Sequence, residues 1–145
     1  MSPEDQGFMA RALRLADNGR YSAHPNPCVG CVLVRQGNVV GEGFHLLAGQ
    51  GHAEANALAD AGTDARESVA YVTLEPCSFH GRTPSCARAL IDAGVSKVVV
   101  AMLDPDARNA GKGVLILREA GIEVVTPFMQ EAAQGLVRGH VSRHT

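Results

Sequence analysis

The chain has 145 residues, of which 46% are hydrophobic and 19% are charged, and its formal net charge is −2 at pH 7. This length and composition predict one globular domain with enough apolar residues for a core. Basic residues are scattered along the sequence, which argues against a binder of nucleic-acid polymers. The sequence shows neither a signal peptide nor an apolar run near the length of a membrane span. We therefore expect a cytoplasmic protein with reduced thiols and no membrane partner.

The N-terminal segment has the pattern of an amphipathic helix. Ser2 is a favourable N-cap, Pro3 suits the first helical position and Gly19 supplies a stop, so the helix should run to about Asn18. Apolar residues at helical spacing form its expected buried stripe, namely Phe8, Ala12, Leu15 and Ala16.

The rest of the chain predicts alternating strands and helices. Two β-rich runs joined by a turn at Gly37-Asn38 indicate a hairpin. In chain order, the predicted elements are strands at 29–34 and 39–42, a helix at 52–61, a strand at 69–74, a helix from Thr83 to Ala93, a strand at 97–103, a helix at 113–120, a strand at 122–126 and a fraying helix at 129–145. This order predicts a three-layer α/β/α protein with a five-stranded mixed sheet.

Chemistry-bearing residues fall at the ends of predicted elements. His52 and Glu54 open one helix, Cys77 follows a strand, and Cys86 lies in the first turn of the next helix. One histidine and two cysteines can hold zinc and leave its fourth position to water, which is the arrangement of a catalytic site. Glu54 is not needed as a ligand and can carry protons to a leaving amine. The pattern is typical of zinc nucleobase deaminases, and a coincidental pair of buried thiols is the alternative.

A second pair of cysteines, Cys28 and Cys31, has C-x-x-C spacing. Half of a zinc knuckle or a redox pair would have this spacing. The two residues fall at a predicted strand, where positions three apart face opposite sides, and no second C-x-x-C completes a site. We therefore expect small core or pocket-wall residues.

Four polar residues have two open interpretations each. Asn26 precedes a proline in a loop, where a turn role and a substrate contact are equally expected. His45 follows a strand and is either an exposed loop residue or a neighbour of the site. Arg82 and Lys112 stand beside glycines at predicted helix starts, where each either binds phosphate or is an ordinary solvated charge.

Several stretches together resemble one known family and span nearly the whole chain. They are NPCVGC from Asn26, GEGFHLLAG, His52-Ala53-Glu54, TLEPCSFHGRTPSC and AGKGVLILREAGIEV. The chain resembles the deaminase domain of the bacterial riboflavin-biosynthesis deaminase/reductase family. The eight residues between Cys77 and Cys86 make the match specific, because cytidine and tRNA adenosine deaminases usually have a much shorter gap there.

The resemblance implies a cytidine-deaminase-like fold and hydrolytic deamination of 2,5-diamino-6-ribosylamino-4(3H)-pyrimidinone 5′-phosphate. It implies that His52, Cys77 and Cys86 bind Zn2+ and that Glu54 is the catalytic proton shuttle. The candidate substrate-binding residues are Asn26, His45, Arg82, Ala53, His80 and Lys112. The family also implies a homo-oligomer and a reductase partner, fused or separate.

Some positions depart from the family's pattern. Phe79 stands where the family commonly has His, Gly51 where it usually has Pro, and Asp106-Ala107 where it has Asn-Pro. Deamination of another free amino-heterocycle or nucleotide is therefore an alternative. A zinc-stabilised binding module, in which Glu54 would be dispensable, is a second. An RNA-editing enzyme is a third, which the charge distribution disfavours.

We expect residues 1–128 to form the deaminase domain and 129–145 to form a C-terminal helix and tail leading toward an absent reductase domain. The chain is then either a stand-alone deaminase or an excised domain. It carries no nicotinamide-binding fingerprint, so no use of NADPH is expected.

Overall fold

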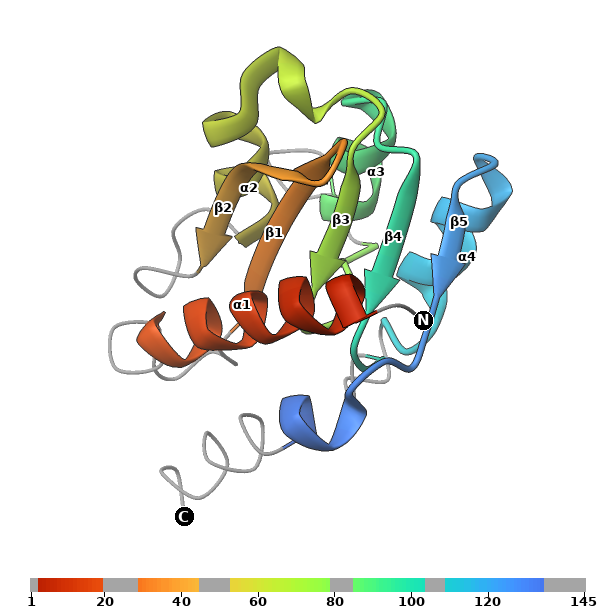
Figure 1. The fold of residues 1–145 in the computed structure, drawn as a ribbon. Coiled ribbons are helices and arrows are strands. Elements are labelled where there is room, and N and C mark those ends of the chain that lie inside the picture. Colours follow the sequence, from red (N-terminus) through yellow and green to blue (C-terminus); the bar gives the residue numbers. More distant parts are fainter. Residues whose placement is uncertain (1–2, 20–28, 45–52, 79–84, 104–108, 135–145) are drawn as a thin grey trace.

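A computed structural model of the chain describes residues 3–19, 29–44, 53–78, 85–103 and 109–134 (Figure 1). Within these ranges, five strands form one mixed sheet in the order β2-β1-β3-β4-β5. β1 is antiparallel to β2 and β3, whereas β3, β4 and β5 are parallel. The strands are β1 (Gly30–Arg35), β2 (Asn38–Phe44), β3 (Val69–Val72), β4 (Lys97–Val100) and β5 (Glu123–Val125).

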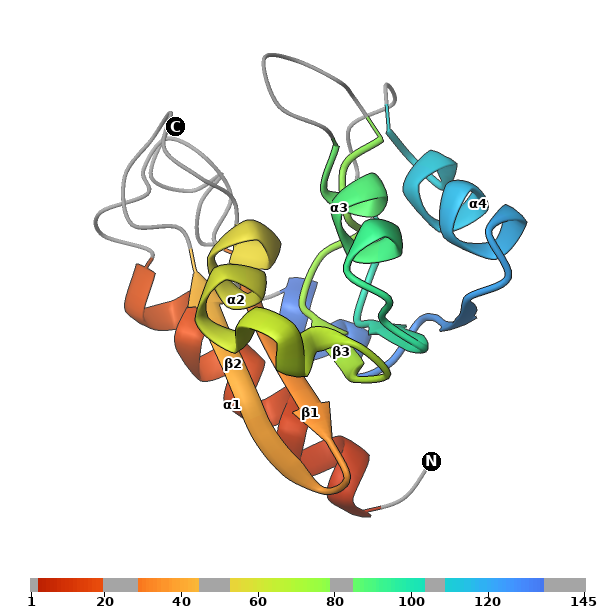
Figure 2. The same cartoon turned by 90° about the horizontal axis from the view of Figure 1, so that it is seen from above.

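Helices cover both faces of this sheet. α1 lies across one face, and α2, α3 and α4 lie on the other (Figure 2). The helices are α1 (Pro3–Gly19), α2 (Ala53–Ala61), the short 3-10 helix η1 (Gly62–Ala65), α3 (Cys86–Asp92) and α4 (Lys112–Glu119). The three-layer architecture and mixed sheet expected from the sequence are confirmed.

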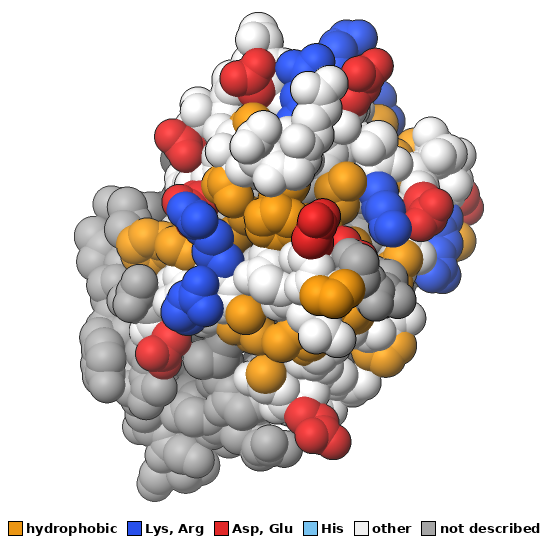
Figure 3. All heavy atoms as spheres, viewed as in Figure 1, with side chains coloured by type: hydrophobic (Ala, Val, Ile, Leu, Met, Phe, Trp, Pro, Cys, Tyr) orange, Lys and Arg blue, Asp and Glu red, His pale blue; other side chains and the backbone are white. Residues whose placement is uncertain are grey.

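The surface carries mixed charge. On the face drawn in Figure 3, Lys and Arg side chains are interspersed with Asp and Glu side chains, and those of the described residues form no extended basic patch there. In the described ranges, no helix has both the length and the apolar character needed to cross a membrane.

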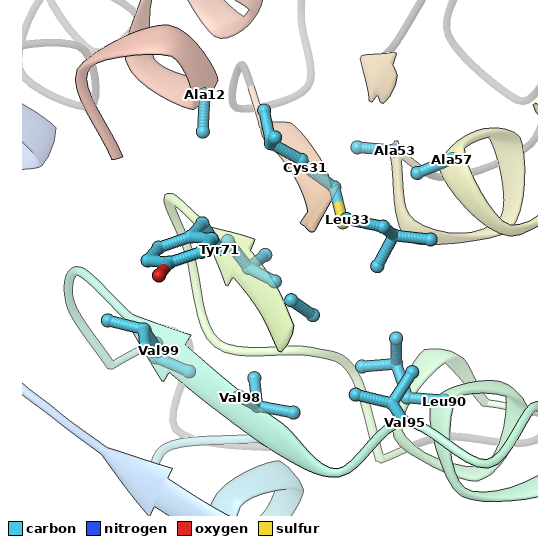
Figure 4. Packing of buried hydrophobic residues seen from close by; sticks show 14 of the residues in the cluster. Ala12, Cys31, Leu33, Ala53, Ala57, Tyr71, Leu90, Val95, Val98 and Val99 are labelled. Carbon is cyan, nitrogen blue, oxygen red and sulfur yellow. The ribbon is translucent and has the colours of Figure 1, made fainter. Parts of the chain in front are cut away.

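The core lies between the sheet and the helices on its two faces. Val98 and Val99 are fully buried, and they point to opposite faces because strand side chains alternate. Val99 and its register partner Tyr71 face α1, while Val98 points toward Leu90 of α3 (Figure 4). β4 is therefore buried on both faces, which is typical of a strand with a continuous apolar run.

The hairpin turn differs from the prediction by one residue. Gln36 and Gly37 have φ values of 53° and 80°, and a two-residue type I′ turn requires positive φ at both central positions. Asn38, which was predicted to be in the turn, pairs with Arg35 as the first residue of β2. The glycine thus occupies the second turn position, where a left-handed backbone carries no steric penalty.

The start of α3 also differs from the prediction. The helix was predicted from Thr83, whereas Ser85 is its N-cap, because the Ser85 Oγ accepts a hydrogen bond from the Arg88 N–H at 3.2 Å. Cys86 is therefore the first helical residue, within the first turn as predicted. Thr83 lies outside the described residues. Strands β3 and β4 are shorter than predicted, because their apolar runs continue past the last ladder residue, and β5 is shorter by one residue at each end.

The buried stripe of α1 includes a residue that the prediction missed. Met9 is fully buried together with Ala12 and Ala16, whereas Phe8 and Leu15 are only partly buried. The C-terminal segment begins a helix at residues 130–134, in agreement with the predicted helix, and the rest of it lies outside the described residues. The boundary at residue 128 stays a prediction.

α2 packs on β2 at a separation that only glycine allows. A Cβ atom on Gly43 would lie 2.2 Å from the Ala53 carbonyl oxygen, and one on Gly41 would lie 2.4 Å from the Ala57 carbonyl oxygen. Ala53 and Ala57 are fully buried on the facing side of the helix. This contact fixes the first turn of α2 and with it the next residue, Glu54.

We predict that Gly43→Ala destabilises the protein by about 1–3 kcal/mol, because the added methyl overpacks the contact between β2 and α2. Urea unfolding measures this change. Gly7→Ala is the control, since a Cβ there meets nothing within 4 Å, and in a helix it should be neutral or stabilise by up to about 1 kcal/mol. Equal stability of Gly43→Ala and the parent would contradict the packing described here.

Candidate active site

Helix N-termini meet at one edge of the sheet. α2, α3 and α4 follow β2, β3 and β4, whose carboxyl ends lie together at the lower edge in Figure 1. Each helix begins near this edge because it must run back along the sheet before the next parallel strand. The N–H groups and dipoles of helix N-termini favour anions. Polar side chains that carry negative charge are therefore least costly to bury at this edge.

Cys77 and Cys86 are brought together at this edge. Cys77 follows β3, and its Sγ accepts a hydrogen bond from the Cys86 N–H at 3.2 Å. The Cys77 carbonyl oxygen accepts a second hydrogen bond from the Ala87 N–H at 3.1 Å. Both donors belong to the first turn of α3, so the start of this helix holds the Cys77 backbone and its sulfur.

Glu54 lies in the first turn of α2 and is 3% exposed. The pKa of the Cys86 thiol is raised, first because it hydrogen-bonds to Cys77, and then because it is buried and lies beside the Glu54 carboxylate. Burial raises the pKa of the Cys31 thiol well above its ordinary value, and the Glu54 charge adds to this effect. The Glu54 carboxylate therefore opposes the ionisation of both buried thiols, Cys31 and Cys86.

The donor set fits Zn2+. Zinc binds thiolate sulfur and imidazole nitrogen, and a divalent cation near the two sulfurs would favour their thiolate forms. The described residues contain no group of three or more His, Cys, Asp or Glu that could hold a metal ion. They supply two of the predicted ligands, Cys77 and Cys86, and the third, His52, lies outside them.

A buried carboxylate that the sequence analysis missed anchors the segment before Cys77. Glu75 is 3% exposed, and its two carboxylate oxygens accept hydrogen bonds from the Gly111 N–H at 2.8 Å and the Val114 N–H at 3.0 Å. These donors belong to the N-terminal end of α4. Glu75 therefore ties the end of β3 to α4. Nothing in the sequence around Glu75, which precedes Pro76-Cys77, predicts that this carboxylate is buried.

The other predicted residues divide into described and undescribed ones. Ala53 is fully buried against β2, so its side chain belongs to the core (Figure 4). Lys112 is exposed at the first position of α4. Cys31 is a buried core residue of β1, as expected. The predicted positions outside the described residues are Asn26, Cys28, His45, Gly51, His52, Phe79, His80, Arg82, Asp106 and Ala107.

Known proteins match the chain over this region. A family model described as "Cytidine and deoxycytidylate deaminase zinc-binding region" matches residues 2–102. The chain is 53% identical over 140 residues to the riboflavin biosynthesis protein RibD of Escherichia coli, which covers 97% of the chain and 38% of that protein. The diaminohydroxyphosphoribosylamino-pyrimidine deaminase of Buchnera aphidicola subsp. Schizaphis graminum is 44% identical over 140 residues, 97% of the chain and 95% of that protein.

A solved structure has the same overall fold. RibD of Acinetobacter baumannii matches with a TM-score of 0.90 and 52% identity, over 96% of this chain and 39% of that one. The chain therefore spans about two fifths of the length of the RibD proteins it matches.

We predict that Glu75→Gln destabilises the protein by about 1–3 kcal/mol, because an amide cannot accept both hydrogen bonds from α4 and leaves a buried donor unpaired. Chemical denaturation measures the loss. Glu123→Gln is the matched control, because this carboxylate is 66% exposed in its pair with Lys97 and should cost under about 1 kcal/mol. Similar losses in the two variants would mean that Glu75 does not anchor β3.

Proposed function

We propose that the chain, which belongs to the cytidine and deoxycytidylate deaminase family, is a hydrolytic deaminase of riboflavin biosynthesis. Its proposed substrate is 2,5-diamino-6-ribosylamino-4(3H)-pyrimidinone 5′-phosphate. The observation that carries this proposal is the buried Glu54 carboxylate beside the Cys77 and Cys86 thiols. The choice of substrate is supported by the 44% identity to a protein named as a deaminase of this pyrimidine, which the chain matches over 95% of its length.

His52, Cys77 and Cys86 are the proposed zinc ligands. The two thiolates come from the carboxyl end of β3 and the first turn of α3, and the imidazole comes from the residue before α2. When bound, zinc would lower the pKa of a water molecule and stabilise negative charge on oxygen. The Cys86 N–H, at the start of α3, favours the thiolate form of Cys77 by donating to its sulfur.

Glu54 is the proposed proton carrier. Its carboxylate would accept a proton from the attacking water and then donate it to the amine that leaves the ring carbon. One C–O bond forms and one C–N bond breaks, so the reaction consumes one water and releases ammonia. Burial of Glu54 suits this role, because few bulk water molecules compete for its proton.

Substrate contacts are proposed at the positions that the family resemblance indicates. Asn26 and His45 would contact the base, and Arg82 would face the ribose phosphate. Lys112, exposed at the start of α4, is a second candidate for the phosphate. The further candidates are His80 and the backbone of Ala53, whose side chain is buried.

Deamination of another amino-heterocycle or nucleotide is the second candidate function. It is favoured by Phe79, Gly51, Asp106 and Ala107, which depart from the family's pattern. The RibD relatives are longer than this chain, which leaves room for a further domain in them. On the family resemblance, the proposed partner is a reductase that acts on the product, in the same polypeptide or a separate one. Self-association and a cytoplasmic location are proposed on the resemblance.

The first test of this function is ammonia release. Zinc-loaded parent protein should release ammonia from the diaminopyrimidinone ribonucleotide, and Glu54→Gln should retain zinc but lose at least about a hundredfold in rate. Glu123→Gln is the surface control and should keep the parent rate. An active Glu54→Gln variant would overturn the proton-carrier role. A zinc-loaded parent that releases no ammonia would favour the second candidate substrate class.

The second test concerns the metal. Cys77→Ser and Cys86→Ser should each lose bound zinc after dialysis, because serine remains a protonated alcohol and is a poor zinc ligand. The zinc content per chain, measured by atomic emission, tests whether each cysteine is a ligand. Cys31→Ser is the matched control: Cys31 is fully buried, so this change should lower stability and leave zinc content unchanged. Loss of zinc in Cys31→Ser alone would refute the proposed ligand set.

A further inference from the structure

Asn109 places its carboxamide against both peptide units that flank Cys77. The side chain is fully buried. Its Oδ1 accepts a hydrogen bond from the Ser78 N–H at 3.1 Å, and its Nδ2 donates to the Pro76 carbonyl oxygen at 3.3 Å. Asn109 lies 32 positions after Cys77 in the sequence, so this contact joins two separate segments at the edge of the sheet.

Hydrogen bonds to these two atoms fix the backbone of Cys77. Each peptide unit is planar, so the Pro76 carbonyl and the Ser78 N–H report the orientations of the planes before and after Cys77. The angle between those planes is set by φ and ψ of Cys77. Because one rigid carboxamide holds both atoms, it restrains both angles and therefore the direction of the Cα–Cβ bond toward Cys86.

The two segments approach as closely as their backbones permit. A Cβ atom on Gly113 would lie 1.9 Å from the Pro76 carbonyl oxygen. Glu75 adds its two hydrogen bonds to the start of α4 on the same side. The start of α3 holds Cys77 from another direction, through the Ala87 N–H. Asn109 is the side chain that hydrogen-bonds to the backbone on both sides of Cys77.

We propose that Asn109 is a positioning residue for the metal site: by orienting Cys77 toward Cys86, it sets the affinity of the site for zinc. This inference rests on the proposed function through the assignment of Cys77 as a zinc ligand. Asn109 does not itself bind the metal. Replacing a residue that hydrogen-bonds to a metal ligand and orients it typically changes the affinity for the metal by about tenfold to a hundredfold.

Two substitutions separate the hydrogen bonds from the volume of the side chain. Asn109→Ala removes the two hydrogen bonds and most of the side-chain volume. Asn109→Leu keeps a branched side chain of similar shape and removes only the hydrogen bonds. Ser68→Ala is the matched control. Ser68 is also fully buried, and its Oγ donates to the Ala65 carbonyl oxygen at 2.6 Å, but it lies at the other end of β3.

The experiment measures Zn2+ affinity by competition with a chromogenic chelator, on chains shown to be folded by circular dichroism. Both Asn109 variants should bind Zn2+ about tenfold to a hundredfold more weakly than the parent, and Ser68→Ala should bind it with parental affinity. The visible absorption of the Co2+-loaded protein gives a second readout. Its tetrahedral bands should weaken or shift in both Asn109 variants and stay unchanged in Ser68→Ala.

Parental affinity, within about twofold, in Asn109→Leu would overturn the proposal, even if Asn109→Ala binds weakly, because packing alone would then explain the effect. Weak binding by Ser68→Ala would also overturn it, since general destabilisation would suffice. A parent that binds Zn2+ but releases no ammonia would refute the proposed substrate alone. In that case the affinity comparison still decides the role of Asn109.

Discussion

Burying the Glu54 carboxylate next to the Cys86 thiol, which lies against Cys77, has an energetic cost that the packing around the site must offset. Glu54 and Cys86 lose hydration because they are buried, whereas Cys77 is half-buried, and both Cys77 and the Glu54 charge raise the cost of ionising Cys86. An apolar surrounding would keep the thiols protonated. The arrangement suits function only because helix N-termini, and the cation that the family binds, oppose this accumulation of negative charge.

The fold meets this requirement by holding the acidic groups on separate, closely packed elements. Glycines of β2 let α2 pack close to the sheet, and this contact positions Glu54 in the first turn of the helix. Cys77 follows β3, and Cys86 is the first residue of α3. Side chains held by packed helices and strands are positioned more accurately than side chains on free loops.

The sequence predicted most of the elements because the apolar pattern and the glycine stops agree with the final packing. The catalytic pattern was equally visible, since zinc chemistry restricts residue type and order. Boundaries were less accurate. The hairpin turn moved by one residue because cross-strand register, which is a long-range property, decided which residues take positive φ.

The supporting residues of the site could not be predicted for a related reason. Glu75 and Asn109 belong to polar stretches that are typical of solvated loops, and their burial depends on contacts between segments far apart in the chain. Met9 was missed because the helical stripe was assigned around Phe8, whereas the orientation of α1 on the sheet is set by its close contact with Gly30. Periodicity gives a face of a helix only approximately.

The proposed zinc site has one histidine and two cysteines as ligands and a fourth position open to water. X-ray absorption at the zinc K edge of the loaded protein measures this ligand set. We expect an average of two sulfur neighbours at about 2.3 Å and two nitrogen or oxygen neighbours at about 2.0 Å. A site with four sulfur neighbours, which would require Cys28 and Cys31, or a site with none would contradict it.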